Sequence, residues 1–305
     1  MPTHTSSKRR GYTLVELLIA IMILGIVAAA MTRIMVSQAN FTSSQAALRG
    51  ARSVSRDAYN ILMTDLRMVQ DSGGLMYAKK DTIKVRIPMA YGLVCATNAT
   101  YTTVSLVPYD SALFALATYG GVAYRDTASG IFKFTPVVAG DVITTEPTPT
   151  VCTDSTAGPG ILTQSYVPAG TAITRTGRVV RVKPQVPAPQ VGAAMFVWQE
   201  IMYAFDSSTV YAHRGRGLYR TVTGTGAAST WTRDEIISPF DSSARIKFYV
   251  YNQDTSQVAV PAQISTIRGF DLVLNGLSVR PPSGATTQKV TKVTTAVFFK
   301  TRRDQ

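Results

Sequence analysis

The stretch KRRGYTLVELLIAIMILGIVAAAMTR, residues 8–33, decides the architecture of this chain. From Tyr12 to Thr32 it contains a single charged residue, Glu16. At about 1.5 Å per residue these helical residues would span about 31 Å, close to the thickness of the hydrocarbon core of a bilayer. Three bases come directly before them: Lys8, Arg9 and Arg10. Positive charge there predicts a cytoplasmic N-terminus, so the chain beyond Arg33 should be exported.

Glu16 separates three readings of this segment. A cleaved secretory signal has its small-residue cleavage site after the apolar run, where Ala28-Ala29-Ala30 would serve. A plain signal anchor explains the length and the basic flank. It gives no reason for a carboxylate inside an apolar helix, which costs roughly 2.5–3.5 kcal/mol on insertion scales. In the third reading the carboxylate has a charged partner, and every part of the segment is then accounted for.

That third reading rests on a resemblance. Residues 8–20, KRRGYTLVELLIA, resemble the class III signal of type IV pilins and pseudopilins. The resemblance implies that a prepilin peptidase cuts between Gly11 and Tyr12 and that the new N-terminus, Tyr12, is methylated. Glu16 would then be the fifth residue of the mature chain, where the family keeps a carboxylate. That carboxylate can pair with the N-terminal ammonium of a neighbouring subunit, because each charge is costly alone in an apolar bundle. Many major pilins carry a proline in this segment, and its absence here favours a minor subunit.

The helical pattern continues past the membrane-length run. Small and apolar residues share one face at 100° per residue, and three arginines lie on the opposite face: Arg49, Arg52 and Arg56. Ser72-Gly73-Gly74 should end the helix. Asp65 interrupts the apolar face, either as a solvated carboxylate at a domain edge or as a partnered charge that fixes how the domain docks. We therefore divide this part into a cleaved leader (1–11), a transmembrane or filament-core helix (12–33) and an amphipathic continuation (34–72).

Beyond residue 75 the period of the apolar residues changes from 3.6 to 2, which predicts strands. Clear alternation occurs at 83–87, 246–250, 270–274 and 293–299, and further strand candidates are 102–107, 131–138, 178–182, 194–205, 209–213 and 217–222. Short strands separated by turn residues favour antiparallel sheet. The predicted fold class is α+β, one long N-terminal helix packed on an exported antiparallel β-domain (75–305). The proline-rich stretch 183–192 joins two possible lobes, 75–182 and 193–305, although a single sheet with a long connection fits equally well.

The C-terminal part adds a second resemblance. Its strings MYAFD (202–206), GLYR (217–220), ARIKFYVY (244–251) and TIRGFDLVL (266–274), with the ending TTAVFFKTR (294–302), resemble strands of J-type minor pseudopilins and PilW-type minor pilins. These strings are degenerate, because many antiparallel domains contain similar ones. The resemblance implies a minor subunit of a type IV pilus or of a type II secretion pseudopilus.

Cys95 and Cys152 are the only cysteines, and His4 and His213 the only histidines. Two of each cannot supply a zinc ribbon, a zinc finger or an iron–sulfur framework. An exported domain meets an oxidising compartment, so a Cys95–Cys152 disulfide is the favoured reading, with two buried thiols as the alternative.

No constellation of residues points to catalysis. His213 lies beside two arginines, which disfavour its protonation, and no acid is positioned for it by the sequence. We therefore expect no enzyme, no cofactor and no metal. The formal net charge of +13 and a basic run in the β-domain raise the question of DNA: Arg175, Arg178, Arg181 and Lys183, with Arg214, Arg216 and Arg220 further on. Solvated sheet faces explain these bases equally well, so DNA is not a favoured partner.

The sequence thus indicates a minor pilin or pseudopilin, a structural subunit that helps to initiate or cap a type IV pilus or type II secretion pseudopilus. The expected location is the bacterial inner membrane, single-pass, with the C-terminal domain in the periplasm or outside. Expected partners are other pilins or pseudopilins through the N-terminal helix, the prepilin peptidase and the inner membrane. Two alternatives stay open: a competence-type minor pilin that binds DNA, and a signal-anchored exported binding protein with no filament role.

Overall fold

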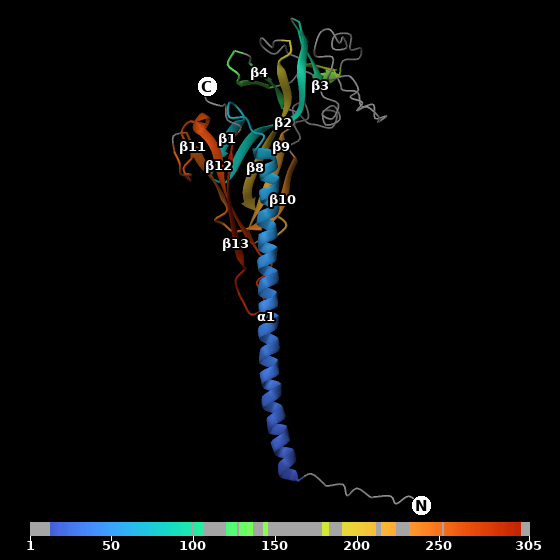
Figure 1. The fold of residues 1–305 in the computed structure, drawn as a ribbon, viewed down its shortest axis with the longest axis vertical. Helices are drawn as coiled ribbons and strands as arrows, with labels where there is room; N and C mark the ends of the chain where they lie inside the picture. Colours follow the sequence, from blue (N-terminus) through green and yellow to red (C-terminus); the bar gives the residue numbers. More distant parts are fainter. Residues whose placement is uncertain are drawn as a thin grey trace, which may run out of the picture.

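One long helix, α1 (Leu14–Leu66), carries a large antiparallel sheet at its C-terminal end, and the sheet extends beyond that end (Figure 1). The computed structural model describes residues 13–98, 100–106, 120–126, 128–136, 143–145, 179–182, 191–211, 215–223, 232–251 and 253–299. The N-terminal half of α1 projects away from the sheet (Figure 1). This is the α+β architecture predicted from the sequence.

The helix begins and ends for local reasons. Thr13 is its N-cap and accepts a hydrogen bond from the backbone N–H of Glu16 at 3.3 Å, which satisfies one of the free amides of the first turn. At the other end Arg67 is the C-cap, so α1 stops before the Ser72-Gly73-Gly74 sequence. Val69 is fully buried in the turn that follows, and Gly73 has a φ of 77°. The buried face of α1 thus continues into this turn, where Val69 packs into the same core.

The described strands form one 13-stranded sheet in which every pairing is antiparallel. The strands are β1 (Leu75–Lys79), β2 (Thr82–Thr97), β3 (Thr102–Leu106), β4 (Gly121–Arg125), β5 (Phe132–Pro136), β6 (Ile143–Thr145), β7 (Val179–Val182), β8 (Ala194–Ser207), β9 (Arg216–Thr223), β10 (Thr232–Phe240), β11 (Arg245–Val250), β12 (Ile267–Leu277) and β13 (Val290–Phe298). A short 3₁₀ helix, η2 (Ile264–Thr266), precedes β12.

The order of paired strands is β11-β12-β10-β9-β8-β2-β3-β7-β6. Strand β13 pairs with β12, β1 pairs with β2, and β4 pairs with β5 and β8. Strands β2 and β8 pair from Thr82↔Ala204 to Leu93↔Ala194. Both strands extend from the part of the sheet that packs on α1 to the part beyond the helix. The proline-rich stretch 183–192 lies between β2 and β8 in the sequence, so residues before it and after it belong to the same sheet.

The two largest hydrophobic cores lie along these long strands. The core nearer the helix buries Ala58, Leu62 and Leu66 of α1 against side chains from β1, β2 and β8 to β13. The distal core lies beyond the end of α1 and is made by β2, β3, β4, β7 and β8. The fully buried residues of α1 begin at Ala51, in the last third of the helix. The domain also touches the turns just before it, where the N–H of Ser283 donates to the Ser43 hydroxyl at 2.8 Å, and it leaves the part before Asn40 uncovered.

One strand candidate from the sequence was wrong. Residues 209–211 form a turn in the connection between β8 and β9, although their sequence predicted a strand. The reason is a carboxylate from a distant strand, Glu235, which holds the amides of this connection, as described below. Strands β1, β4, β6 and β10 were not predicted at all.

Candidate assembly and docking site on the N-terminal helix

The first part of α1 presents apolar side chains on every side. Leu14, Met22, Leu24 and Met35 are each more than two thirds exposed, and Phe41 is 66% exposed. The helix is long and apolar enough to cross a membrane by length and composition, and none of its most apolar window is buried. A soluble protein rarely exposes a contiguous apolar patch larger than a few hundred Å². This surface therefore belongs in a membrane or against other apolar helices.

Glu16 lies in the first turn of this apolar helix. Its backbone N–H donates to Thr13, and its side chain is exposed. A carboxylate there interacts favourably with the positive end of the helix dipole. No ion pair is present for Glu16 within residues 13–98. The other residues of the predicted processing site, Lys8, Arg9, Arg10, Gly11 and Tyr12, lie outside the described residues.

The docked part of the helix is held by a close approach between α1 and β12. The hydroxyl of Ser55 is fully buried and accepts a hydrogen bond from the backbone N–H of Gly276 at 3.0 Å. The same oxygen lies 3.2 Å from the carbonyl oxygens of Ala51, Leu274 and Thr291, and its single proton donates to one of them. A Cβ on Gly276 would lie 2.3 Å from the carbonyl oxygen of Ala51. The absence of a side chain at Gly276 therefore sets how closely the helix meets the sheet.

One residue before its end, α1 makes a polar contact with the centre of the sheet. The hydroxyl of Tyr203 on β8 donates a short hydrogen bond to the carboxylate of Asp65. Arg220 on β9 donates to the Tyr203 hydroxyl at 3.2 Å and lies 3.7 Å from the Asp65 carboxylate. Burial and the neighbouring Asp65 charge raise the pKa of Tyr203, so the phenol stays protonated. Of the two readings of Asp65, the structure supports the partnered charge that fixes domain docking.

A third contact joins the end of the helical segment to the distal part of the sheet. The guanidinium of Arg86 lies over the rings of Phe134 and Trp198, at 5.0 and 4.8 Å from their centroids. Its Nη1 also donates to the carbonyl of Gly73 at 3.0 Å. Burial lowers the pKa of Arg86. A weakly hydrated, planar guanidinium is the charged group best suited to lie between aromatic rings.

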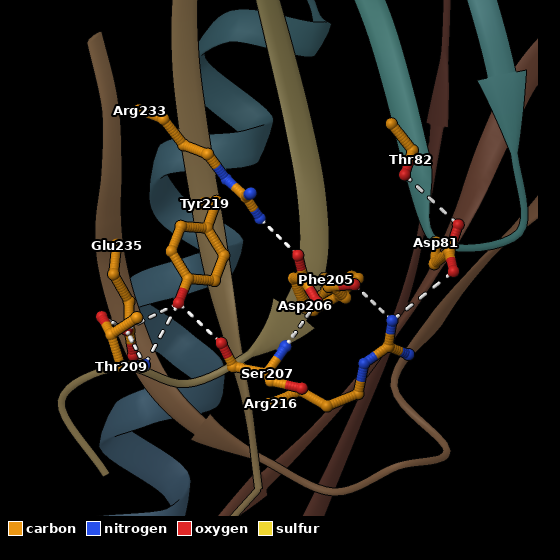
Figure 2. A network of polar contacts seen from close by, with 10 residues as sticks. All are labelled: Asp81, Thr82, Phe205, Asp206, Ser207, Thr209, Arg216, Tyr219, Arg233 and Glu235. Atoms are coloured by element: carbon orange, nitrogen blue, oxygen red, sulfur yellow. Dashed lines mark hydrogen bonds and ion pairs between the residues drawn. The ribbon is translucent and has the colours of Figure 1, made fainter. Parts of the chain in front are cut away.

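Below the helix end, Glu235 of β10 organises the β8–β9 connection (Figure 2). Its carboxylate accepts hydrogen bonds from the Ser208 hydroxyl at 2.5 Å, from both the N–H and the hydroxyl of Thr209 at 2.7 Å, and from the N–H of Val210 at 3.2 Å. The Tyr219 hydroxyl lies 2.9 Å from the same carboxylate. Burial opposes ionisation, but the hydrogen bonds outweigh it and lower the pKa of Glu235 to about 2. The ionised carboxylate thus fixes the turn at residues 209–211.

The described members of the basic run suggested by the sequence, Arg181, Arg216 and Arg220, are engaged in such contacts. Arg216 lies 3.5 Å from the carboxylate of Asp81 (Figure 2). It also donates to the carbonyl of Ala244 at 3.3 Å. Arg220 contacts Asp65, and Arg181 lies over the ring of Tyr101 at 4.5 Å. The remaining members of the suggested basic run lie outside the described residues: Arg175, Arg178, Lys183 and Arg214. These contacts leave less positive charge available for a polyanion than the sequence alone indicates.

Of Cys95, Cys152 and His213, only Cys95 lies within the described residues. Cys95 lies in β2 and is 8% exposed. Cys152 and His213 lie outside the described residues, so the Cys95–Cys152 disulfide stays a prediction. Within the ranges that the structure describes, no group of three or more His, Cys, Asp or Glu side chains is arranged to hold a metal ion.

The chain thus combines a membrane-length apolar helix, a carboxylate in its first turn, a docked last third and a β-domain at the far end, which fits the pilin-like reading of the sequence. Comparison with known families agrees at the N-terminus: the prokaryotic N-terminal methylation motif matches residues 6–32. This match fits a class III prepilin-type signal and supports a pilin-like or pseudopilin protein, which implies contact with the prepilin peptidase and the assembly machinery. No curated protein and no solved structure shows a significant match to the chain.

Proposed function

We propose that this protein is a minor pilin or minor pseudopilin that helps to initiate or cap the assembly of a type IV pilus or of a type II secretion pseudopilus. The observation that carries the proposal is the division of α1. Its N-terminal part bears the methylation motif and exposes apolar side chains all round, while its last third is buried in a β-domain. Such a helix can enter a bundle of similar helices without unfolding the domain that it carries.

The proposed course of assembly follows from the same helix. The precursor lies in the inner membrane with its β-domain on the periplasmic side. The peptidase cuts between Gly11 and Tyr12, and the new N-terminus is methylated. The apolar part of α1 then moves sideways into a bundle of neighbouring helices, where Glu16 pairs with the N-terminal ammonium of another subunit.

The size of the domain supports a minor rather than a repeating subunit. Residues 75–305 form most of the chain, and the sheet extends well past the end of α1 (Figure 1). A domain of this bulk would crowd a closely repeating lattice, so few copies are expected, at the tip where assembly begins.

A clean deletion of the gene, scored in parallel for surface pili and for the secreted proteome, tests this proposal. Loss of pili with normal secretion would assign the protein to a type IV pilus, and loss of secretion with normal pili would assign it to type II secretion. If neither changed, the role in assembly would be rejected. An N-terminus that still carries Met1 or Pro2, independent of any prepilin peptidase, would instead support a signal-anchored binding protein.

A further inference from the structure

The uncovered face of α1 carries positive charge that forms no ion pair within the described residues. Between residues 33 and 64 the helix contains four arginines and a single carboxylate, Asp57. Three of the arginines form the arginine stripe, defined as Arg49, Arg52 and Arg56, and all three are exposed. Within the described ranges none of the three forms an ion pair, and Asp57 instead accepts a hydrogen bond from Ser53 at 3.1 Å. The stripe is therefore a basic surface with no acidic counterpart of its own.

Half of the eight arginines in the described strands are used differently. Arg216, Arg220, Arg233 and Arg268 each lie within 4 Å of an aspartate carboxylate. These four strand arginines therefore have acidic partners within the described residues, whereas the three arginines of the stripe do not. Five side chains of α1 that face the sheet are fully buried: Ala51, Ser55, Ala58, Leu62 and Leu66. The β-domain therefore covers one side of the helix and leaves the side of the stripe open.

The height of the stripe argues against lipid head groups as its counterpart. Arg33 ends the apolar run, and Arg49 lies 16 residues further along the same helix, about 24 Å away at 1.5 Å per residue. Surface potentials of a membrane decay over about 8 Å at physiological ionic strength. A helix standing in the membrane therefore holds the stripe beyond the reach of anionic lipid.

The geometry of a helix bundle places a protein there instead. Helices that pack side by side lie 8–10 Å apart, and a crossing angle of about 20° separates them by only about 9 Å more over 24 Å of length. A helix that packs on the apolar part of α1 must approach from the side that the β-domain leaves open. It then runs alongside the stripe, within the span of arginine and glutamate side chains that extend toward each other.

We propose that the arginine stripe is the contact surface for the neighbouring subunit in the filament, and that this subunit presents acidic side chains on the extra-membrane part of its own helix. The inference rests on the proposed function, since it names the chemistry of the assembly partner. Its ion pairs set which subunit lies beside this one and in which vertical register, because matched charges favour one alignment and like charges penalise others.

The test uses the full-length chain in the bacterium that encodes it, with a photo-crosslinking amino acid placed at one of two exposed helix positions. One position is Ser53, between the arginines, and the other is Ile23, in the apolar part. Each is combined with the triple variant Arg49→Glu, Arg52→Glu, Arg56→Glu. The matched control reverses three exposed bases of the β-domain, Lys80→Glu, Arg245→Glu and Arg280→Glu, which changes the net charge equally.

We expect both positions of the wild-type chain to crosslink to a protein that carries a prepilin-type signal. The stripe variant should be processed and inserted normally but lose the Ser53 product by at least tenfold, while the control triple keeps it. Crosslinking of Ser53 to phospholipid or nucleic acid, no product at Ser53, or a product insensitive to charge reversal would each overturn the inference alone. If Ile23 gave no pilin-like product, the proposed function would fail with it.

Discussion

The hydroxyl of Tyr203 on β8 donates a hydrogen bond to the carboxylate of Asp65 on α1, across 138 residues of sequence. Arg220 on β9 contacts both groups, so the helix and two central strands meet at one polar point. The three side chains mutually satisfy groups that are largely removed from water. The helix is therefore fixed in rotation and height by this contact, in addition to its apolar packing.

Loss of the Tyr203 hydroxyl should weaken the docking of the helix. Tyr203→Phe removes one charged-acceptor hydrogen bond and leaves Asp65 with Arg220 only, so we expect a loss of about 1.5–3 kcal/mol in the free energy of unfolding. Asp65→Asn should cost a similar amount, and the double variant should cost less than the sum. Denaturant unfolding of the detergent-solubilised chain measures all three.

The matched control for this prediction is Tyr59→Phe on the same helix. Tyr59 is half-buried, and no hydrogen bond of its hydroxyl is present within the described residues. It should change stability by less than about 0.5 kcal/mol. Equal losses in Tyr59→Phe and Tyr203→Phe would show that the Asp65 contact contributes nothing specific.

Gly276 and Gly50 should respond in opposite directions to substitution by alanine, because only Gly276 is closely packed. A Cβ at Gly276 would lie 2.3 Å from the Ala51 carbonyl oxygen and 2.5 Å from the Ser55 hydroxyl, so Gly276→Ala must displace the helix from the sheet. We expect a loss of about 1–3 kcal/mol. A Cβ at Gly50, the residue before Ala51 on α1, meets nothing within 4 Å, so Gly50→Ala should instead stabilise by about 0.5–1 kcal/mol. Thermal unfolding distinguishes the opposite signs.

The contrast between what the sequence predicted and what it missed has a physical basis. The residues of α1 follow a local period, and Asp65 stood out because it interrupts an apolar face. Tyr203 and Arg220 lie inside the strings that resemble minor pilin strands, but nothing local indicates that they meet at Asp65. Their contact depends on the register of β8 against β9, where Tyr203 pairs with Arg220. Such long-range register is invisible to periodicity.

Glu235 illustrates the same limit in a single residue. It lies in β10, a strand that periodicity does not predict because RDEIISPF lacks an alternating pattern. Its carboxylate accepts a hydrogen bond from the N–H of Val210, 25 residues earlier in the sequence, and so organises the turn there. The apolar alternation of residues 209–213 suggested a strand, and the hydrogen bonds to Glu235 overrode that local preference. A signal for this arrangement exists only in three dimensions.

The low pKa of Glu235 predicts how acid affects stability. Its pKa in the folded chain is about 2, against an ordinary value of 4.5. The stabilisation is therefore fully present above about pH 4.5 and is lost as the pH falls toward 2. Because solvent reaches this carboxylate, we expect a contribution of only about 1 kcal/mol. Glu235→Gln should flatten the pH dependence of the unfolding free energy between pH 4.5 and 2, whereas Asp234→Asn, an exposed neighbour, should not.

The predicted Cys95–Cys152 disulfide would close a loop that spans much of the distal region. In the chain-entropy model a loop of this size adds about 4 kcal/mol to stability. We expect a non-reducing peptide map of the exported chain to contain the cross-linked peptide, and reduction to lower the unfolding temperature. A map with two separate, alkylatable thiols would show that both cysteines are simply buried.

The carboxylate of Glu16 should act in assembly and not in processing. The peptidase reads the segment around Gly11 and Tyr12, so Glu16→Ala should be cut and methylated as efficiently as the wild type, which mass spectrometry of the mature N-terminus measures. Its incorporation into sheared filaments or pseudopili should fall by at least tenfold, because the ammonium of the neighbouring Tyr12 or its equivalent would be left unpaired in an apolar bundle. Asp57→Ala removes the other exposed carboxylate of α1, on the part of the helix outside the bilayer, and serves as the control with normal incorporation expected. Normal incorporation of Glu16→Ala would contradict the pairing of these two charges and would leave the apolar faces of the helices as the sole basis for assembly.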